Sequence, residues 1–314
     1  MKRQNVGNTM YIMSGHKIIS VLLVAAFFIF GFWPALDPCF ALDWKRLHEE
    51  ADRKNLPEAL LAAEKHPGSI AELYMLGLVY LNLHKDKEAE DIFNRIIKSG
   101  PATVEARWGL AESLRRQHQP EKSEIILKEV MRLDPGFSPA YISMAYLKYI
   151  NMDFNGTVRL ALKVIQQGRG DVDLSNYVRA YTLYAGAKGM IAHYGGPVSK
   201  VINGMAILRN LKKAEELQPD STAVNFGLGT FYLLAPPLAG GNLDKAEEYL
   251  KKAVTLDPLF VDACIRLAQI YKIKGDDKQY DYYIEKASEI DPKNVLLIDT
   301  LSGKCKFICV GRER

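Results

Sequence analysis

The stretch TAVNFGLGTFYLLAPPLAGGNLDKAEEYLKKAVTLDP, residues 222–258, decides the fold of this chain. Its apolar residues recur at helical spacing on both sides of a Pro-Pro and Gly-Gly break, which predicts two amphipathic helices joined by a loop. The small residues Gly229, Ala246 and Ala253 let the two helices approach closely, and bulky residues fill the remaining space. Pro258 ends the second helix, so the stretch predicts one closely packed helical hairpin.

The same order of small and large residues recurs along the chain at a fixed spacing. Pro101 to Pro135 is 34 residues, and Pro258 to Pro292 is again 34 residues. The matching positions are Leu76, Gly77, Tyr80, Ala89 and Phe93, then Leu110, Ala111, Leu114, Ser123, Leu127 and Val130, then Leu228, Gly229, Tyr232, Ala246, Leu250 and Ala253, and finally Leu267, Ala268, Tyr271, Gly275 and Ala287. By these residues the chain resembles the tetratricopeptide repeat family. The resemblance implies an all-α fold, a right-handed α-solenoid of stacked helix pairs with capping helices.

The template divides the chain into units that follow one another. The expected solenoid at 70–292 consists of the units 70–101, 102–135, 138–169, 173–219, 222–258 and 259–292, with a degenerate capping helix pair at 42–69 before it and a C-terminal cap and tail at 293–314 after it. The units 173–219 and 222–258 are longer than the template by about ten and about five residues. Insertions in repeat proteins fall in loops, often on one face, so we expect two Gly/Pro loops side by side.

Residues 1–41 have the pattern of a targeting segment. A basic start is followed by the apolar run 18–36, and Cys39-Phe40-Ala41 form a small-x-small site. This order predicts a secretory signal peptide that is cut after Ala41. The run is also long enough to span a bilayer, so an uncleaved anchor in the inner membrane is the alternative. Both interpretations place the repeats in the periplasm, with membrane contact only through this segment if it stays uncleaved.

The charge balance argues against a nucleic-acid partner. The chain has 41 Lys and Arg residues against 37 Asp and Glu residues, which gives a formal net charge of +4. A surface that follows phosphates needs a strong excess of basic residues, and this composition does not provide one.

No arrangement typical of a catalytic centre or a metal site is found in the sequence. The motifs H-E-x-x-H, G-x-x-x-x-G-K-[ST] and G-x-S-x-G are all missing. His193, beside a Gly-Gly pair, is the one histidine singled out, and the alternative for it is a solvated side chain in a turn. We therefore expect a non-enzymatic protein with no metal or other cofactor.

We expect different roles for the four cysteines. Cys39 belongs to the leader, and Cys264 is expected to be a small buried apolar residue within a repeat. Cys305 and Cys309 lie four residues apart near the C-terminus. They are either two free thiols or a disulfide, which would require a non-helical segment and an oxidising compartment.

The first helices of such units line the concave side of the solenoid, and their inner positions here are mainly apolar or aromatic. The candidate residues of a ligand or partner groove are Tyr74, Leu78, Trp108, Ile142, Tyr146, Tyr149 and Phe226. The candidates in loops near the groove are His193, Gly195, Gly196, Pro236, Pro237, Gly240 and Gly241. An exposed apolar groove predicts capture of a protein partner or an apolar small molecule. The alternative is that these rings pack against the next unit or against a returning terminal helix.

A second resemblance lies within residues 181–258. The run VNFGLGTFYLLAPPLAGGNLDKAEEYLKKAV is similar to the T-component of tripartite ATP-independent periplasmic transporters, through a glycine, a short apolar run and P-P-x-x-G-G-x-x-x-K-A. This resemblance implies a periplasmic helical protein whose hydrophobic cavity serves small apolar ligands alongside a solute-binding partner. The leader lacks the lipoprotein box that is typical of that family.

Overall fold

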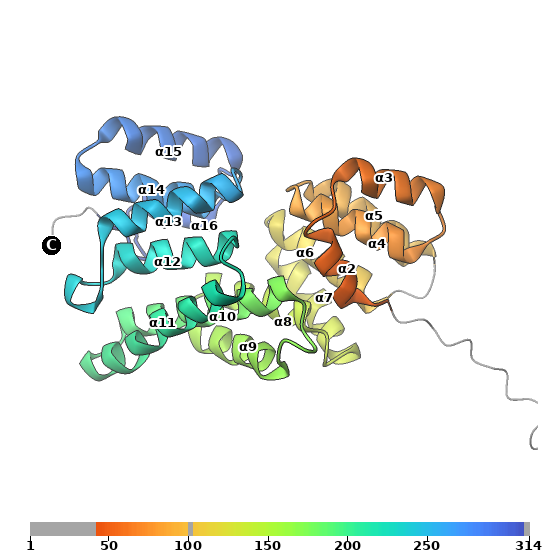
Figure 1. Ribbon diagram of the computed structural model, residues 1–314, viewed down its shortest axis with the longest axis horizontal. Coiled ribbons are helices and arrows are strands. Elements are labelled where there is room, and N and C mark those ends of the chain that lie inside the picture. The colour runs from red at the N-terminus through yellow and green to blue at the C-terminus, as the bar shows by residue number, and fades with distance from the viewer. Residues whose placement is uncertain (1–41, 100–102, 311–314) are drawn as a thin grey trace, which may run out of the picture. The chain divides into compact units, whose positions relative to one another are not determined.

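The computed structural model describes residues 42–99 and 103–310, and all of their regular elements are helices (Figure 1). They are α2 (Trp44–Ala51), α3 (Leu56–Lys65), α4 (Ile70–Asn82), α5 (Asp86–Ser99), α6 (Val104–Arg116), α7 (Pro120–Leu133), α8 (Ser138–Ile150), α9 (Phe154–Gln167), α10 (Leu174–Tyr194), α11 (Pro197–Leu217), α12 (Thr222–Leu234), the 3₁₀ helix η1 (Pro237–Ala239), α13 (Leu243–Leu256), α14 (Val261–Lys274), α15 (Asp277–Ile290) and α16 (Val295–Leu301). The expected all-α class is confirmed. None of these helices combines the length and apolar character needed to cross a bilayer. The expected signal peptide or anchor lies outside the described residues.

Successive helices from α4 to α15 form antiparallel pairs, in which α4 packs on α5, α6 on α7, and so on to α14 and α15. Neighbouring pairs pack on each other as well, so the pairs stack into a right-handed α-solenoid. At the ends of this stack, α3 packs on α4, and α16 packs on α14 and α15. The fold that the repeats predict is therefore confirmed.

Short polar side chains fix where many of the helices begin. Ser69 Oγ accepts a hydrogen bond from a backbone N–H of the first turn of α4 at 3.3 Å, and Thr103 Oγ1 does the same for α6 at 3.2 Å. Asn242, at the N-cap of α13, accepts from the N–H of Lys245 at 2.9 Å. Each bond satisfies a backbone donor that has no partner within its own helix.

Tight turns of one conformation join the helices of four pairs, α4–α5, α6–α7, α8–α9 and α14–α15. His84, His118 and Met152, each 34 residues after the last, have φ of 56°, 60° and 62°. Gly275 takes the same place in the last pair, with φ of 73°. The N–H of the residue after each of them bonds back to a carbonyl five residues earlier, as in Lys85 to Tyr80 O at 2.9 Å. The repeated turn gives these four pairs the same connection.

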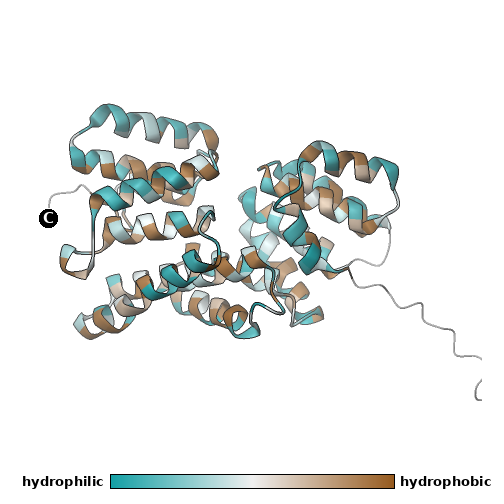
Figure 2. Ribbon diagram, viewed as in Figure 1, coloured by the Kyte–Doolittle hydropathy of each residue, from teal (hydrophilic) through white to brown (hydrophobic). Residues whose placement is uncertain are grey.

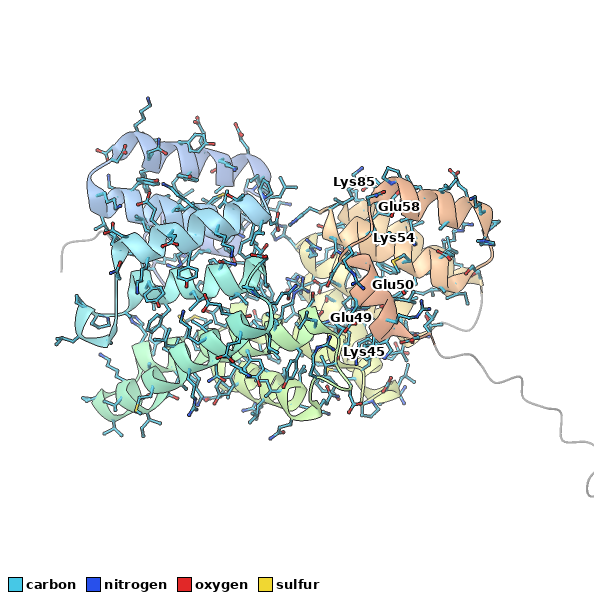
Figure 3. All side chains as sticks on the ribbon, viewed as in Figure 1. Lys45, Glu49, Glu50, Lys54, Glu58 and Lys85 are labelled. Carbon is cyan, nitrogen blue, oxygen red and sulfur yellow. A yellow bond between two sulfur atoms is a disulfide. The ribbon has the colours of Figure 1, made fainter. Side chains whose placement is uncertain are left out.

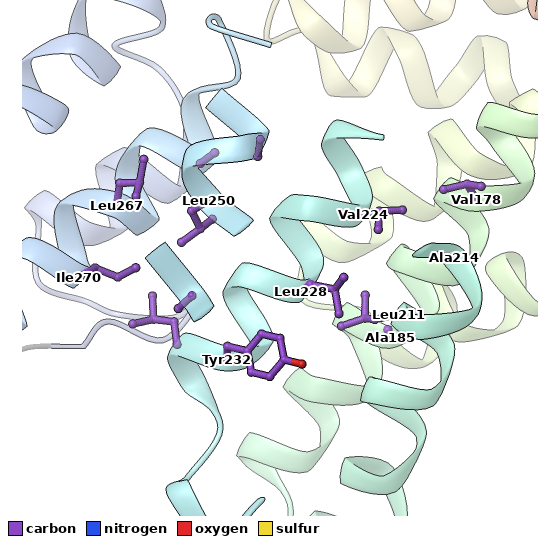
Figure 4. Packing of buried hydrophobic residues seen from close by; sticks show 14 of the residues in the cluster. Val178, Ala185, Leu211, Ala214, Val224, Leu228, Tyr232, Leu250, Leu267 and Ile270 are labelled. Atoms are coloured by element: carbon purple, nitrogen blue, oxygen red, sulfur yellow. The ribbon is translucent and has the colours of Figure 1, made fainter. Parts of the chain in front are cut away.

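Glycines let large side chains reach the neighbouring helix. The Phe93 ring lies between Gly77 of α4 and Gly109 of α6, where an added Cβ would lie 2.6 Å and 2.4 Å from the ring atom Cε1. At Gly229 an added Cβ would lie 2.6 Å from Leu250 Cγ. The close approach expected from the small residues is thus observed, and Leu250 belongs to a continuous apolar core (Figure 4).

The helices α10 and α11 are longer than the other repeat helices. Each has 21 residues, whereas the helices of the other pairs have 13 or 14. The extra residues of unit 173–219 therefore extend both helices, and only Gly195 and Gly196 lie between them. The expectation that this insertion forms a loop is wrong, because no proline interrupts residues 174–194. The insertion of unit 222–258 does form a turn, around η1.

Candidate functional site

The helix α2 lies on the inner side of the first repeats, where it packs on α4 and α10. Leu47, His48 and Ala51 form its buried face. Two charged residues marked in Figure 3 fasten it to the loop after α9, since Lys45 Nζ donates to the carbonyl of Gly170 and Glu49 pairs with Arg169 at 2.8 Å. A segment of the same chain thus occupies part of the inner face.

This helix covers residues that were expected in an open groove. His48 Nε2 and Tyr74 Oη are hydrogen-bonded at 2.8 Å, and the His48 and Trp108 ring centroids are 5.0 Å apart. Tyr74 is 0% and Trp108 5% exposed, and Leu78 is also buried. Packing against a returning terminal helix, the alternative interpretation, therefore describes Tyr74 and Trp108. Burial lowers the pKa of the His48 imidazole, although Asp173 opposes this shift.

A buried polar network lies next to this packed region. Glu112 accepts two hydrogen bonds from Arg115, at 2.9 and 2.6 Å, and one from Ser143 Oγ at 2.8 Å. Ser143 Oγ also accepts from Trp108 Nε1 at 3.0 Å, and the Arg115 guanidinium lies 4.2 Å from the Tyr146 ring centroid. Burial is the largest single effect and would raise the pKa of Glu112, but Arg115 together with Arg116 and Ser143 lowers the pKa to about 2. The carboxylate is thus held ionised inside the protein.

Beyond the region covered by α2, the inner face of the repeats encloses a cavity of about 2390 Å³. Its walls come from α6, α8, α10, α11, α12 and α14, together with the segment after α16. Of the candidate residues, those that line it are Trp108, Ile142, Tyr146, Tyr149, Phe226, His193 and Pro236. The turns at Gly195–Gly196 and η1 both lie at the left edge of the ribbon in Figure 1. Gly195, Gly196, Pro237, Gly240 and Gly241 of these turns do not line the cavity.

Sequence reasoning missed the wall that α10 provides. Leu183, Gly186, Met190 and His193 all line the cavity and follow one another at helical spacing. This spacing could have identified the face. It was overlooked because the template for a first helix ends well before Met190.

The segment after α16 forms another wall that the repeat pattern does not predict. Asp299 accepts backbone hydrogen bonds from Lys306 at 2.9 Å and Phe307 at 2.8 Å. Buried Arg266 donates to the carbonyls of Phe307 at 2.8 Å and Ile308 at 2.7 Å. A disulfide between Cys305 and Cys309 closes this non-helical segment, which was one of the two alternatives for these residues. Cys264 is a buried free thiol, as expected.

Two His–Asp pairs connect the first repeats with the last. His84 Nε2 lies 3.0 Å from Asp257 Oδ2, and His118 Nε2 lies 2.8 Å from Asp291 Oδ1. Both the histidines and the aspartates are 34 residues apart, so the two pairs are equivalent contacts displaced by one repeat. All four side chains border the cavity. The turns that end α4 and α6 thereby meet the ends of α13 and α15.

The chemistry of the cavity wall is that of a binding surface. Partly buried rings such as Tyr149 and Phe226 supply apolar contact area. Among residues 42–99 and 103–310, no group of three or more His, Cys, Asp or Glu side chains could hold a metal ion.

Two parts of the sequence match family models described as tetratricopeptide repeat. One match covers residues 74–136, and the other covers residues 238–258 and 261–294. No curated protein matches the chain.

Several solved structures have a similar arrangement of helices. The APC/C hetero-tetramer Cut9–Hcn1 matches with a TM-score of 0.56 at 16% identity, over 90% of this chain and 52% of that chain. A tetratricopeptide repeat protein from Parabacteroides merdae matches with a TM-score of 0.50 at 13% identity, over 82% of this chain and 97% of that chain. At such identities the likeness concerns the fold alone.

Proposed function

Because this chain is a tetratricopeptide repeat protein, we propose that it is a non-enzymatic periplasmic scaffold that captures a protein partner in the cavity of its inner face. Stacked helix pairs create extended concave surfaces, and repeat proteins use these surfaces for binding. The cavity of about 2390 Å³ carries the proposal.

The distribution of covered and uncovered rings supports this role. α2 covers Tyr74 and Trp108, whereas Tyr149 and Phe226 farther along the inner face remain partly exposed in the cavity. Burying one apolar side chain of this size is worth about 1.5–3 kcal/mol. A few such contacts are enough for binding without charge pairing, so the cavity suits an apolar segment of a partner.

The proposed location depends on two features. The pattern of residues 1–41 is that of an export signal or an anchor. The disulfide between Cys305 and Cys309 suits an oxidising compartment such as the periplasm. Both features support an exported protein.

A second candidate is an accessory protein that binds a small apolar ligand, like the T-component of tripartite ATP-independent periplasmic transporters. The observation that favours it is the apolar patch of Ile207, Leu208 and Leu234 in the cavity wall. Such a patch could hold an acyl chain as well as a peptide side chain.

One substitution tests whether the cavity is the binding site. An added Cβ at Gly186 would make only ordinary contact with Tyr149, at 3.7 Å. Gly186→Phe is therefore expected to fill cavity space without displacing the wall. Gly68→Phe is the matched control, because Gly68 is exposed outside the cavity with nothing within 4 Å of an added Cβ.

The measurement is crosslinking and capture from cell envelopes, with mass spectrometry of an organic extract of the purified protein. We expect Gly186→Phe to lose a partner that wild type and Gly68→Phe both retain, at unchanged helical content by circular dichroism. Loss of a co-purified lipid instead of a protein would favour the second candidate. Equal capture by all three proteins would contradict both.

A further inference from the structure

The hairpin of α10 and α11 carries an exposed apolar stripe near its tip. Val198, Val201, Ile202 and Met205 are 72%, 63%, 64% and 76% exposed. Their spacing of three, four and seven residues after Val198 places them on one face of α11. Because both helices are about two turns longer than their neighbours, adjacent repeats do not cover this face. Figure 2 shows apolar segments at this end of the hairpin, at the lower left.

The hairpin is also free of acidic residues over most of its length. Residues 174–214 contain no Asp or Glu, but they contain six Lys or Arg residues. Lys212 and Lys213, at the base, pair with the glutamates that follow, at 2.7 and 3.0 Å. Lys200 and Arg209 are exposed. Arg209 lies one turn after Met205, so a basic side chain follows the apolar stripe on the same face.

More basic residues reach the tip from the C-terminal segment. Tyr194, the last residue of α10, donates a hydrogen bond from its hydroxyl to the carbonyl of Lys306 at 2.7 Å. Lys304 and Lys306 are exposed. The stripe is thus accompanied by positive charge from two parts of the chain.

We infer that the tip of this hairpin docks on the surface of an anionic lipid bilayer. An apolar stripe bordered by Lys and Arg is typical of helices that enter the headgroup region, where they reach a depth of about 5–10 Å. The stripe from Val198 to Met205 is about 10 Å long, which gives about two turns of helix for contact with the headgroup region. Val198 and Ile202 lie outside the cavity proposed to capture a partner, whereas Lys200, Val201 and Met205 also line it.

A bilayer fits these features better than an acidic protein. The residues that dominate protein interfaces fill well-packed pockets, whereas this stripe lies on a projecting helix end. The sequence alone confines membrane contact to residues 18–36, and that run, if retained, would hold the repeats close to a bilayer. The stripe adds a second contact whose strength depends on the charge of the lipid.

The test uses the full chain and measures whether the tip of the α10–α11 hairpin passes from water into lipid. Ile202→Cys carries an environment-sensitive nitrobenzoxadiazole label, in a background with Cys39→Ser and Cys264→Ala. The control is the same label at Ile125→Cys on α7, because Ile125 is also an exposed isoleucine, at 69%. Each protein is titrated with vesicles of phosphatidylglycerol and phosphatidylcholine, and with vesicles of phosphatidylcholine alone. The label reports its own surroundings, so the readout does not depend on how residues 18–36 behave.

We expect a blue shift at position 202 with the anionic vesicles only, and no shift at position 125. Lys200→Gln with Arg209→Gln should weaken the response about 25-fold, since each basic residue near such a surface contributes about fivefold. Lys65→Gln with Lys98→Gln, two exposed lysines of α3 and α5, should leave it unchanged. A missing shift, an equal shift with both vesicles, or a shift caused by soluble polyglutamate instead of lipid would overturn the inference.

Discussion

The carboxylate of Glu112 is ionised although it is buried, and burial disfavours its charge. Arg115, Ser143 and the ring of Tyr146 form a closed set of contacts around the carboxylate and its guanidinium partner. Replacing one member of such a pair leaves the other buried without its partner, which costs more than the pair itself contributes. Glu112 and Arg115 lie three residues apart on α6, and their contact forms in the folded state.

We expect the pH dependence of the free energy of unfolding to reveal the contribution of Glu112. The pKa of Glu112 falls from its ordinary 4.5 to about 2 in the folded protein. A lowered pKa stabilises the fold above the ordinary value, so the contribution is complete above pH 4.5 and is lost as the pH falls toward 2. Glu112→Gln should therefore be less stable at pH 7, on the order of 3 kcal/mol, and this difference should shrink in acid.

Urea unfolding at a series of pH values, followed by circular dichroism, measures this difference. Glu285→Gln is the matched control, because Glu285 is exposed on α15. Parallel pH profiles for the wild type and Glu112→Gln would contradict the assignment.

Among the elements, α2 differs from the rest because its partners are distant in sequence. His48 bonds to Tyr74, 26 residues away, and lies 3.4 Å from Asn176 Nδ2, 128 residues away. α2 lies in the segment 42–69, for which the repeat pattern predicts only a degenerate capping helix pair. Its amphipathic pattern predicts a helix but gives no information about which surface the helix covers.

His48→Ala tests how strongly α2 is held. The substitution removes the partner of the buried Tyr74 hydroxyl, and an unsatisfied buried group costs about 1–3 kcal/mol. We expect a loss of this size in chemical denaturation, with stronger iodide quenching of tryptophan fluorescence as the helix loosens and uncovers Trp108. His66→Ala, in the exposed turn after α3, should change neither. Unaltered quenching and stability in His48→Ala would show that α2 is not held by this contact.

The repeat pairs were predictable because their packing is local. Gly77, Phe93 and Gly109 lie within two successive units, so their order of sizes predicts the contact between adjacent pairs. The cavity was predictable only in part, since the wall near Phe307 depends on a hydrogen bond from Arg266, 41 residues earlier. The extension of α10 and α11 was missed because added length was assigned to a loop by default.

In the whole solenoid, contacts between distant repeats supplement the stacking of neighbours. His84 with Asp257 and His118 with Asp291 join units that do not follow one another in the chain. Repeat proteins otherwise gain stability from nearest neighbours. These two pairs therefore couple the first and last repeats.

A double-mutant cycle measures that coupling. Each side chain of the His118 and Asp291 pair is about a third exposed, at 33% and 28%, so solvent screens the attraction. His118→Ala, Asp291→Ala and the double variant should give a coupling of about 0.2–1 kcal/mol in urea unfolding. Additive effects of the two substitutions would show that the contact contributes nothing to stability.

The disulfide between Cys305 and Cys309 makes the final structure of the protein depend on oxidation. The short ring it closes contains Phe307 and Ile308, whose carbonyls are the acceptors for the buried cation of Arg266. In a newly translated chain both thiols are reduced. The two acceptor carbonyls would then lie on a segment that no covalent link closes, and one wall of the hollow would be incomplete. Oxidation of these two thiols would then complete this wall, so the cavity would reach its final form only where electrons can be withdrawn from that pair of sulfurs.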